Sequence, residues 1–421
     1  MAYAIHNAVR QNDLDLLKSL SGDLNARDNN GWTPLELACD RGHTEIVRYL
    51  ISQNVDVNTS DAEGWTPLHY ASIKNNEELV EILMAAKANL NVRNEGGYTS
   101  LFKAIENKFV ETTGALLLHG ADVNIGKNDG VTPLMLASEL GDQDVVNALL
   151  GHGAVVTLKD FRGMTALHYA SLAGRDQVVT ILLGHGALVN DMTEAGLTPL
   201  YCACQEGHTQ TARILIDRGA DVNAAANDGF TPLYVASADG HNDLVEMLLT
   251  CGAKTDDAKG RGCTPVYIAS QMGHREVLKT LIKHGACVNT KTSTGATPLS
   301  VASEFGRLDV VSLLLQNRAP VNVHTDDGMT PLHWACMRGH KEVCDLLIGS
   351  GANISAKCRV YGNTPLHTAT LYGRPKVVTC LLEHHADTSA KNNYGHTAAH
   401  VAKKKGYKDI VAILRPHKSR R

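Results

Sequence analysis

The sequence lacks the features that usually mark a membrane or secreted protein. It has no stretch of about 18 uninterrupted apolar residues, the length that a membrane-spanning helix needs. Its first residues, Met1 to His6, show no basic segment followed by an apolar run, so no secretory signal is expected. Ten cysteines are present without a C-x-x-C pair, and aromatic residues make up only 5% of the chain. These absences predict a cytoplasmic or nuclear protein with reduced thiols and a core of small aliphatic side chains.

Motifs of enzyme chemistry are missing as well. The H-E-x-x-H spacing of zinc sites does not occur, and Cys202 and Cys204 are too close in sequence to share a helix face. There is no G-x-S-x-G motif for a nucleophile and no G-x-x-x-x-G-K-[ST] loop for phosphate. The sequence therefore predicts no catalytic residues, no metal site and no cofactor.

The net charge of -4 gives no general case for binding nucleic acid or membranes. The charge is unevenly distributed, however, because residues 359–421 contain twelve Lys or Arg and only three Asp or Glu. The most basic parts are Lys403 to Lys405 and the end of the chain, Lys418 to Arg421. Three interpretations stay open for this basic end: a solvated cap, a nuclear-import signal, or a contact with an acidic membrane surface.

One pattern recurs through almost the whole sequence. A clear copy is Gly328-Met329-Thr330-Pro331-Leu332-His333-Trp334-Ala335. With its glycine as position 0, copies begin at Gly31, Gly64, Gly97, Gly130, Gly163, Gly196, Gly229, Gly262, Gly295, Gly328, Gly362 and Gly395. Ten of the eleven intervals are 33 residues, and the interval from Gly328 to Gly362 is 34. So strict a period predicts an elongated repeat array rather than separate globular domains.

The positions within one copy predict its local structure. Threonine at position +2 is present in every copy and can cap a helix, and proline follows it in nine of twelve copies, where a helix tolerates it. Alanine at position +7 is invariant, and glycine often stands at position +11, where it can end the helix. A second apolar helix and a polar, glycine-bearing link follow. Each repeat is therefore predicted as turn, helix, loop and helix.

The 33-residue period with Thr-Pro-Leu-His-x-Ala resembles the ankyrin-repeat family, and this resemblance covers essentially residues 1–421. It implies an all-α repeat solenoid with short hairpin-like turns, in which hairpin tips and first helices line a concave groove. We expect an N-terminal capping unit in residues 1–27, repeats 1 to 11 in residues 28–391, and a terminal repeat with a basic tail in residues 392–421. The array is expected to start and stop within this chain.

The resemblance also assigns roles to recurring polar residues. It implies that the histidines of the Leu-His position, His69, His168, His333, His367 and His400, form hydrogen bonds within and between repeats. Asparagine six residues before the repeat glycine reads as a turn residue. For Asn58, Asn124 and Asn223, the resemblance adds hydroxylation by an asparaginyl hydroxylase as an alternative.

Positions that stacking leaves free are the candidates for partner binding. Positions +9 and +10 should face solvent at the end of the first helix, yet they are apolar in several repeats, at Leu140, Leu172, Met272, Phe305, Met337, Leu371 and Tyr372. Position +1, in the hairpin, adds Trp32, Trp65, Phe230 and Met329. Some of these rings are expected to pack between hairpins. Contiguous exposed apolar groups usually mark interaction sites, so these residues form the predicted partner-binding set.

The sequence therefore predicts a monomeric, non-catalytic scaffold or adaptor that binds an extended or helical segment of another protein. The acidic residues Glu206, Asp239 and Glu304 would suit a basic, amphipathic segment. One alternative is a substrate-recognition or regulatory subunit, such as one of a ubiquitin ligase, although no recruitment box follows Leu414. Another is an adaptor at an anionic membrane or in the nucleus, acting through the basic end. Neither nucleic-acid binding nor stable membrane insertion is expected.

Two places depart from the repeat pattern. In the third repeat, Asn107-Lys108-Phe109 replaces the usual turn and Ser100 replaces proline, which predicts local fraying. The extra residue of the array falls in the link Lys357 to Tyr361, which should protrude or bulge.

Overall fold

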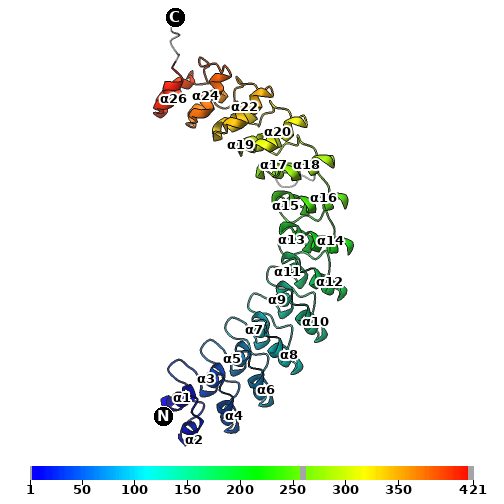
Figure 1. Ribbon diagram of the computed structural model, residues 1–421, viewed down its shortest axis with the longest axis vertical. Helices are drawn as coiled ribbons and strands as arrows, with labels where there is room; N and C mark the ends of the chain where they lie inside the picture. Colours follow the sequence, from blue (N-terminus) through cyan, green and yellow to red (C-terminus); the bar gives the residue numbers. More distant parts are fainter. Residues whose placement is uncertain (1, 257–261, 416–421) are drawn as a thin grey trace. The chain divides into compact units, whose positions relative to one another are not determined.

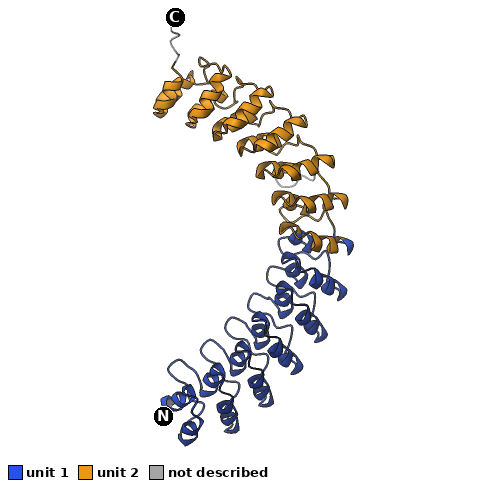
Figure 2. Cartoon of the chain, viewed as in Figure 1, with its two compact units in different colours: residues 1–203, 217–220 blue, residues 204–216, 221–421 orange. Residues whose placement is uncertain are grey.

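The computed structural model describes residues 2–256 and 262–415. Helices and connecting loops make up this described part, and it contains no β-strand. The helices follow one another in chain order as pairs (Figure 1). Their contacts divide the chain into two compact units, one of residues 1–203 and 217–220 and one of residues 204–216 and 221–421 (Figure 2). The predicted boundaries at residues 27 and 391 stay predictions.

In unit 1, odd-numbered first helices pack on one another and even-numbered second helices pack behind them. Its helices are α1 (Ala2–Arg10), α2 (Leu14–Ser19), α3 (Pro34–Arg41), α4 (Thr44–Ser52), α5 (Pro67–Ile73), α6 (Glu77–Ala85), α7 (Ser100–Glu106), α8 (Val110–Leu118), α9 (Pro133–Leu140), α10 (Gln143–Gly151), α11 (Ala166–Leu172) and α12 (Asp176–Gly184). The division between the units falls in the next repeat, which contains α13 (Pro199–Gln205) and α14 (Thr209–Asp217).

Unit 2 repeats the same arrangement of stacked first and second helices. Its helices are α15 (Pro232–Ala238), α16 (Asn242–Thr250), α17 (Pro265–Met272), α18 (Arg275–Lys283), α19 (Pro298–Glu304), α20 (Leu308–Gln316), α21 (Pro331–Arg338), α22 (Lys341–Gly349), α23 (Pro365–Leu371), α24 (Pro375–Glu383), α25 (Ala398–Lys405) and α26 (Lys408–Ile413). The predicted unit of turn, helix, loop and helix is confirmed.

Helix α21 shows why the repeat motif forms a short helix. The hydroxyl of Thr330 accepts the backbone N–H of His333, and Pro331 occupies the first helical position, where no N–H is needed. At the other end Gly339 adopts a left-handed conformation with φ 93°, and its N–H donates to the carbonyl of Ala335. Position +7, here Ala335, is fully buried because neighbouring first helices approach closely there.

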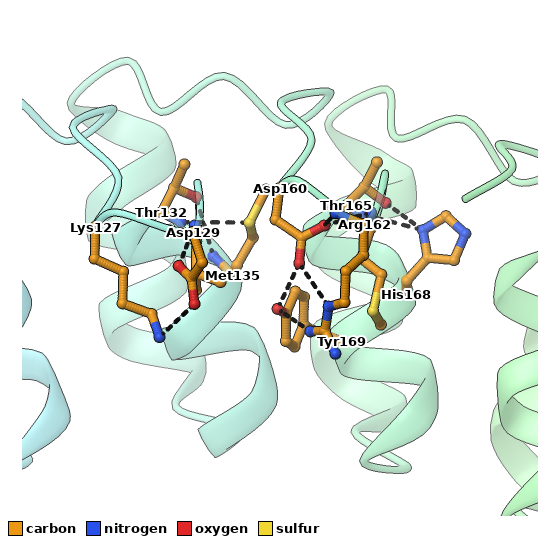
Figure 3. Close-up of polar contacts among 11 residues, drawn as sticks. Lys127, Asp129, Thr132, Met135, Asp160, Arg162, Thr165, His168 and Tyr169 are labelled. Atoms are coloured by element: carbon orange, nitrogen blue, oxygen red, sulfur yellow. Dashed lines mark hydrogen bonds and ion pairs between the residues drawn. The ribbon is translucent and has the colours of Figure 1, made fainter. Parts of the chain in front are cut away.

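In four repeats, a histidine at the Leu-His position joins its repeat to the next. In His69, Nδ1 accepts the N–H of Thr66 at 3.1 Å, and Nε2 donates to the carbonyl of Tyr98 in the following repeat at 3.0 Å. The structural role implied by the family resemblance is confirmed by the same two contacts at His168, His333 and His367. Figure 3 shows the Thr165–His168 pair in unit 1. His400, in the last repeat, is exposed.

The hairpin-like links, here called fingers, are tight turns joined to their neighbours. In the finger before α21, the N–H of Thr325 donates to the carbonyl of Met329, and the N–H of Gly328 donates back to Thr325. The N–H of Asp326 reaches the preceding finger at the carbonyl of Thr294. In unit 1, buried Asp160 also fixes a finger by accepting the hydroxyl of Tyr169 at 2.9 Å (Figure 3).

The extra residue widens the following finger, as predicted. The N–H of Cys358 donates to the carbonyl of Asn363, five residues on rather than four. Cys358 is buried, but Val360 and Tyr361 are 59% and 50% exposed, so the enlarged tip presents two apolar side chains to solvent. The finger keeps its bond to the preceding one, from the N–H of Arg359 to the carbonyl of Asp327.

The third repeat keeps both helices, α7 and α8, despite its unusual residues. Thr99 still caps α7 by accepting the N–H of Phe102 at 3.2 Å. Lys108 takes the left-handed conformation with φ 59°, which costs a residue with a Cβ about 1–2 kcal/mol. This strain is a physical reason for local opening, and the fraying itself stays a prediction.

Among the helices within residues 2–256 and 262–415, none combines the length and apolar character that a membrane span requires.

Candidate partner-binding groove

Three adjoining hollows lie between the fingers and the first helices of unit 2, and together they are called the groove here. The acidic hollow has a volume of about 450 Å³ and includes Glu304 of α19 and Asp326 of the next finger. The middle hollow, of about 210 Å³, shares Asp327 and Trp334 with it. The basic hollow, of about 440 Å³, shares Tyr361, Asn363, Leu371 and Tyr372 with the middle one. Because each hollow shares residues with the next, one continuous surface runs from α17 to α25.

The middle hollow is apolar and aromatic. Met337 of α21 and Leu371 of α23 line it from the helices, and Met329 lines it from a finger. Trp334, on α21, lies at the boundary with the acidic hollow. Its indole Nε1–H is buried and donates to no acceptor within the described residues. A buried donor without a partner costs about 1–3 kcal/mol, so this N–H is a local cost to the fold and, being buried, is not a contact open to a ligand.

The acidic hollow carries carboxylates of Glu304, Asp326 and Asp327. Glu304 is held by Arg338 of the next repeat at 2.7 Å. Tyr267 lines the same hollow, and burial, together with the nearby Cys263 and Glu304, raises its pKa to about 12. Its hydroxyl is therefore neutral at physiological pH and can donate a hydrogen bond. This end of the groove suits a cationic or hydrogen-bond-accepting group.

The basic hollow ends at Lys404 and Lys405 of α25. Tyr361 and Tyr394, from two neighbouring fingers, lie stacked across its edge with ring centroids 6.4 Å apart. The ring of His396 stacks on that of His400 with centroids 4.0 Å apart. Two ammonium groups beside aromatic rings form an environment for an anionic side chain or a chain carboxylate.

The walls of the groove are held in place by arginine or histidine side chains at position +12 that cap the first helix of the preceding repeat. Arg374 donates from Nε to the carbonyl of Met337 at 3.0 Å, and Arg307 does the same to Gln271. Nε2 of His340 lies 3.0 Å from the carbonyl of Glu304, which can only accept, so the ring donates. These bonds satisfy carbonyls that the end of a helix leaves free, and they fix the spacing of α17, α19, α21 and α23.

Comparison with known proteins identifies the repeats. A family model described as "Ankyrin repeats (3 copies)" matches residues 5–94, 76–160, 101–193, 167–258, 233–325, 288–358 and 357–420, and these overlapping matches together span nearly the whole chain. The chain belongs to the ankyrin-repeat family. The predicted family and the predicted all-α repeat solenoid are confirmed. Ankyrin repeats are protein-interaction modules, so this chain is a protein-binding repeat protein.

Individual relatives match only short parts of this ankyrin-repeat chain. Protein phosphatase 1 regulatory subunit 27 from Mus musculus is 46% identical over 52 residues, 12% of this chain and 34% of that protein. The same figures hold for the subunit from Homo sapiens. Acyl-CoA-binding domain-containing protein 2 from Arabidopsis thaliana is 44% identical over 54 residues, 12% of this chain and 15% of that protein. The chain thus matches about a third or less of the length of these relatives.

Four residues of the predicted partner-binding set meet in the groove. Met329, Met337, Leu371 and Tyr372 all line the middle hollow, although they come from two repeats. Met272 and Phe305 are each 44% exposed at the ends of α17 and α19, and neither lines the three hollows. Phe230 stacks on Tyr234 with ring centroids 4.1 Å apart.

The other members of the predicted set belong to unit 1. The ring of Trp32 lies 4.8 Å from that of Tyr70, and the ring of Trp65 lies 5.7 Å edge-on from that of His69. Both contacts are to residues of helix α5, so packing of these rings between hairpins stays a prediction. Leu140 and Leu172 are half-buried at the ends of α9 and α11. Partner binding by these four residues stays a prediction that is separate from the groove of unit 2.

Several groove residues were missed by the sequence reasoning. Trp334 stands at position +6 of the repeat, which was not among the positions considered free. Tyr361 and Tyr394 stand at the residue just before the repeat glycine, at the tip of the finger. Aromatic content gave no signal, because residues 334–394 contain four aromatic residues, close to the average of 5% for the chain. Only the stacking of repeats shows that positions +6 and the finger tips face one surface.

The asparagines six residues before the repeat glycine bridge neighbouring ankyrin repeats. The side-chain oxygen of Asn223 accepts the N–H of Lys254 at 2.9 Å, and its amide donates to the carbonyl of Gly252. Asn124 makes the same two bonds, and Asn58 accepts the N–H of Asn89 at 2.7 Å. Hydroxylation of Asn58, Asn124 and Asn223 stays a prediction. Intact-mass measurement after incubation with an asparaginyl hydroxylase tests it, and no added oxygen would remove it.

Residues able to hold a metal occur together outside the groove. Asp345 of α22, Cys380 of α24 and His384 just after α24 place one ligand atom each within 4.8 Å of the others. No sequence motif marks this cluster, because its ligands come from two repeats. The cluster lies on second helices, whereas the groove is lined by first helices and fingers.

Proposed function

We propose that this protein is a non-catalytic, monomeric adaptor that holds an extended segment of another protein in the groove of unit 2. One observation carries this proposal. Four apolar side chains of the predicted partner-binding set converge in a single hollow, which lies between an acidic hollow and a basic hollow. A concave apolar pocket with a few charged groups beside it is the usual form of a binding site that selects a side chain.

The charges along the groove define the chemistry of the segment. A Lys or Arg of the segment fits beside Glu304 and Asp326, a large apolar residue fits the middle hollow, and an Asp, Glu or chain carboxylate fits beside Lys404. An extended segment suits separate hollows in a row, because its alternate side chains point to the same side. This narrows the predicted basic amphipathic segment to one that is basic at one end only.

The affinity expected from this site is moderate. Burying one or two large apolar side chains contributes about 1.5–3 kcal/mol each. The charged ends add to this, while ordering of a flexible segment subtracts from it. Dissociation constants in the micromolar range are expected, which suits an adaptor that exchanges its partners.

Selection from a library of random peptides displayed on phage tests the proposal. The full chain is expected to enrich peptides with a basic residue, a large apolar residue and an acidic residue in this order or its reverse. The variant Met337→Ser/Leu371→Ser should lose this enrichment, while Phe305→Ser, which changes an exposed apolar residue outside the hollows, should keep it. Circular dichroism checks that each variant stays folded. Enrichment by the double variant equal to that of the natural chain would overturn the proposal.

A charge reversal gives a sharper test of orientation. Lys404→Glu/Lys405→Glu changes only exposed side chains at the basic end. It is expected to replace the acidic residue in the selected peptides by a basic one and to leave the preference for the apolar residue unchanged. An unchanged selection would show that the segment does not reach α25.

The alternatives differ in their support. The name of the two phosphatase regulatory subunits supports a regulatory subunit as a narrower form of the same proposal, although the match covers 52 residues. Co-purification of phosphatase activity with the full chain, lost in Met337→Ser/Leu371→Ser, would favour it. A ubiquitin-ligase subunit has no specific observation in its favour.

The remaining alternative, an adaptor at a membrane or in the nucleus, depends on the basic residues near the end of the chain. Of these, Lys404 and Lys405 lie in the groove, and Lys418, Arg420 and Arg421 lie outside the described residues. We propose a cytoplasmic location, with the nucleus as the alternative. Imaging of a tagged full chain beside a variant lacking residues 416–421 distinguishes the two, because loss of a nuclear signal on truncation would favour nuclear import.

A further inference from the structure

A pair of one histidine and one carboxylate recurs between second helices of neighbouring repeats. His119, after α8, lies 2.9 Å from Glu81 of α6, and His284, after α18, lies 3.2 Å from Glu246 of α16. The third pair is His384 and Asp345, at 3.1 Å. In each pair the histidine stands at position +22 of one repeat and the carboxylate at position +17 of the repeat before it. The repeat geometry therefore places imidazole and carboxylate side by side at all three points.

One of the three pairs has a third ligand. Cys380 stands at position +18, one helical turn before His384, and its Sγ lies 3.0 Å from Oδ1 of Asp345. The corresponding residues beside the other pairs are Ala115 and Thr280. Alanine has no donor atom, and the hydroxyl of Thr280 donates to Asn242 instead. The thiol thus converts a repeated ion pair into a set of sulfur, nitrogen and oxygen ligands.

The three ligand atoms are close to the arrangement that a tetrahedral metal ion needs. Zinc bonds of 2.0–2.3 Å place neighbouring ligand atoms about 3.3–3.8 Å apart. Oδ1 of Asp345 lies 3.0 Å from Sγ of Cys380 and 3.1 Å from Nε2 of His384, so small side-chain shifts admit an ion. Lys341 approaches the other oxygen, Oδ2, at 3.6 Å, which leaves Oδ1 for the metal.

The surroundings leave room for a fourth ligand. Cys380 is buried, but the side chains of Asp345 and His384 are each 39% exposed. Water can therefore complete the coordination from the solvent side. Asp345 lies between the thiol and the imidazole, whereas a cysteine nucleophile requires the imidazole beside the thiol. This order favours binding of a cation over catalysis.

We propose that Asp345, Cys380 and His384 bind one Zn²⁺ ion, with a water molecule as the fourth ligand. Thiolate and imidazole select zinc over magnesium and calcium, which prefer oxygen ligands alone. On binding, the thiol of Cys380 releases its proton to solvent and the sulfur–zinc bond replaces the hydrogen bond to Asp345. The ion links α22 to α24 and so fixes the distance between two of the repeats that form the groove. The site does not depend on the proposed function.

Titration with Co²⁺, which reports zinc sites by its colour, tests this proposal on the reduced full chain. One equivalent of Co²⁺ is expected to give a thiolate charge-transfer band in the near ultraviolet and the visible bands of tetrahedral cobalt, and Zn²⁺ should abolish both. Cys380→Ser should remove the charge-transfer band. His384→Gln and Asp345→Asn should weaken Zn²⁺ binding more than about tenfold, since even outer-shell partners contribute that much.

Matched controls come from the repeat itself. His284→Gln changes the equivalent histidine of a pair that lacks the thiol, and Cys287→Ser removes an exposed cysteine elsewhere in unit 2. Both variants should bind Co²⁺ and Zn²⁺ like the natural chain. Cys380 is buried, so Cys380→Ser can disturb folding. His384 is exposed, and His384→Gln therefore supplies a second measurement: Zn²⁺ should no longer raise the melting temperature of this variant.

Two results would overturn the proposal: a charge-transfer band that survives Cys380→Ser, or equal losses in His284→Gln and His384→Gln. Peptide selection with the His384→Gln variant shows whether the zinc site and the groove are independent. Without added zinc, this variant should select the same peptides as the natural chain.

Discussion

His333 of α21 donates from Nε2 to the carbonyl of Asn363 in the next finger at 3.0 Å. On the other side of the ring, Nδ1 accepts the N–H of Thr330 at 3.2 Å. The two contacts require a neutral ring with its hydrogen on Nε2, because a proton on Nδ1 would face the N–H of Thr330. Burial is the main cause that lowers the pKa of His333 to about 4, and it does the same for His69 in unit 1.

The lowered pKa of His333 predicts a loss of stability in mild acid. The unfolded histidine binds its proton near pH 6.5 and the folded one near pH 4, so the unfolded chain binds more protons between these values. Stability is therefore complete above about pH 7 and falls as the pH drops toward 4, by up to about 3 kcal/mol for this residue. Urea midpoints between pH 7.5 and 4.5 measure this. His333→Gln should make the urea midpoint less dependent on pH, whereas His400→Gln, at an exposed residue, should not. An equal pH dependence in the two variants would contradict the expectation.

Glu36 occupies the Leu-His position of the first repeat and predicts the opposite pH dependence. Its Oε2 accepts the N–H of Thr33 at 2.8 Å, while Oε1 is buried and has no hydrogen-bond partner among residues 2–256 and 262–415. Burial raises its pKa, so the folded chain keeps the proton to a higher pH and stability falls as the pH rises through this range. Glu36→Gln is expected to stabilise the protein by about 1–3 kcal/mol at pH 7.5, because it removes a buried charge. Thermal melts at pH 5 and 7.5 check it, and Glu45→Gln, on the exposed face of α4, serves as the control.

The left-handed Lys108 predicts a stabilising substitution in the third repeat. Lys108→Gly should stabilise this repeat by about 1 kcal/mol, because glycine adopts φ 59° without strain. Lys108→Ala keeps the Cβ and should bring no gain. Hydrogen exchange of the amides in α7 and α8 measures the effect locally. Protection of residues 70–140 that is already uniform in the natural chain would show that the predicted fraying does not occur.

Two glycines predict opposite effects of the same substitution. Gly306 has φ 70°, and a Cβ there would lie 2.5 Å from Nδ1 of His340, whose ring is held by its bond to Glu304. Gly306→Ala should therefore destabilise by more than about 1–2 kcal/mol. Gly114, inside α8, has open space where its Cβ would be, so Gly114→Ala should stabilise by about 0.5–1 kcal/mol. Urea midpoints of both variants measure these changes in stability, and a lower midpoint for Gly114→Ala than for the natural chain would contradict the expectation.

Much of the fold could be predicted because each repeat position has one structural task. Thr330 and Pro331 start a helix, Gly339 ends it, and Ala335 lets neighbours pack closely, and these tasks depend only on nearby residues. The groove was harder to predict. Met337 and Leu371 were recognised as unusual for their position, but so were Met272 and Phe305, which do not line the hollows. Whether such an apolar residue lines a hollow depends on the side chains of the neighbouring finger, and the repeat motif does not specify those side chains.

By itself, the sequence determined the period, the helix pairs and the family, because local capping and close packing repeat every 33 residues. Only the tertiary structure decided which side chains of different repeats meet. Trp334 and Tyr361 are 27 residues apart and line one hollow, and Asp345 and His384 are 39 residues apart and lie 3.1 Å from each other. The physical reason is that stacking places residues about one repeat apart side by side. Such contacts depend on the identity of single side chains, which the repeat motif leaves free.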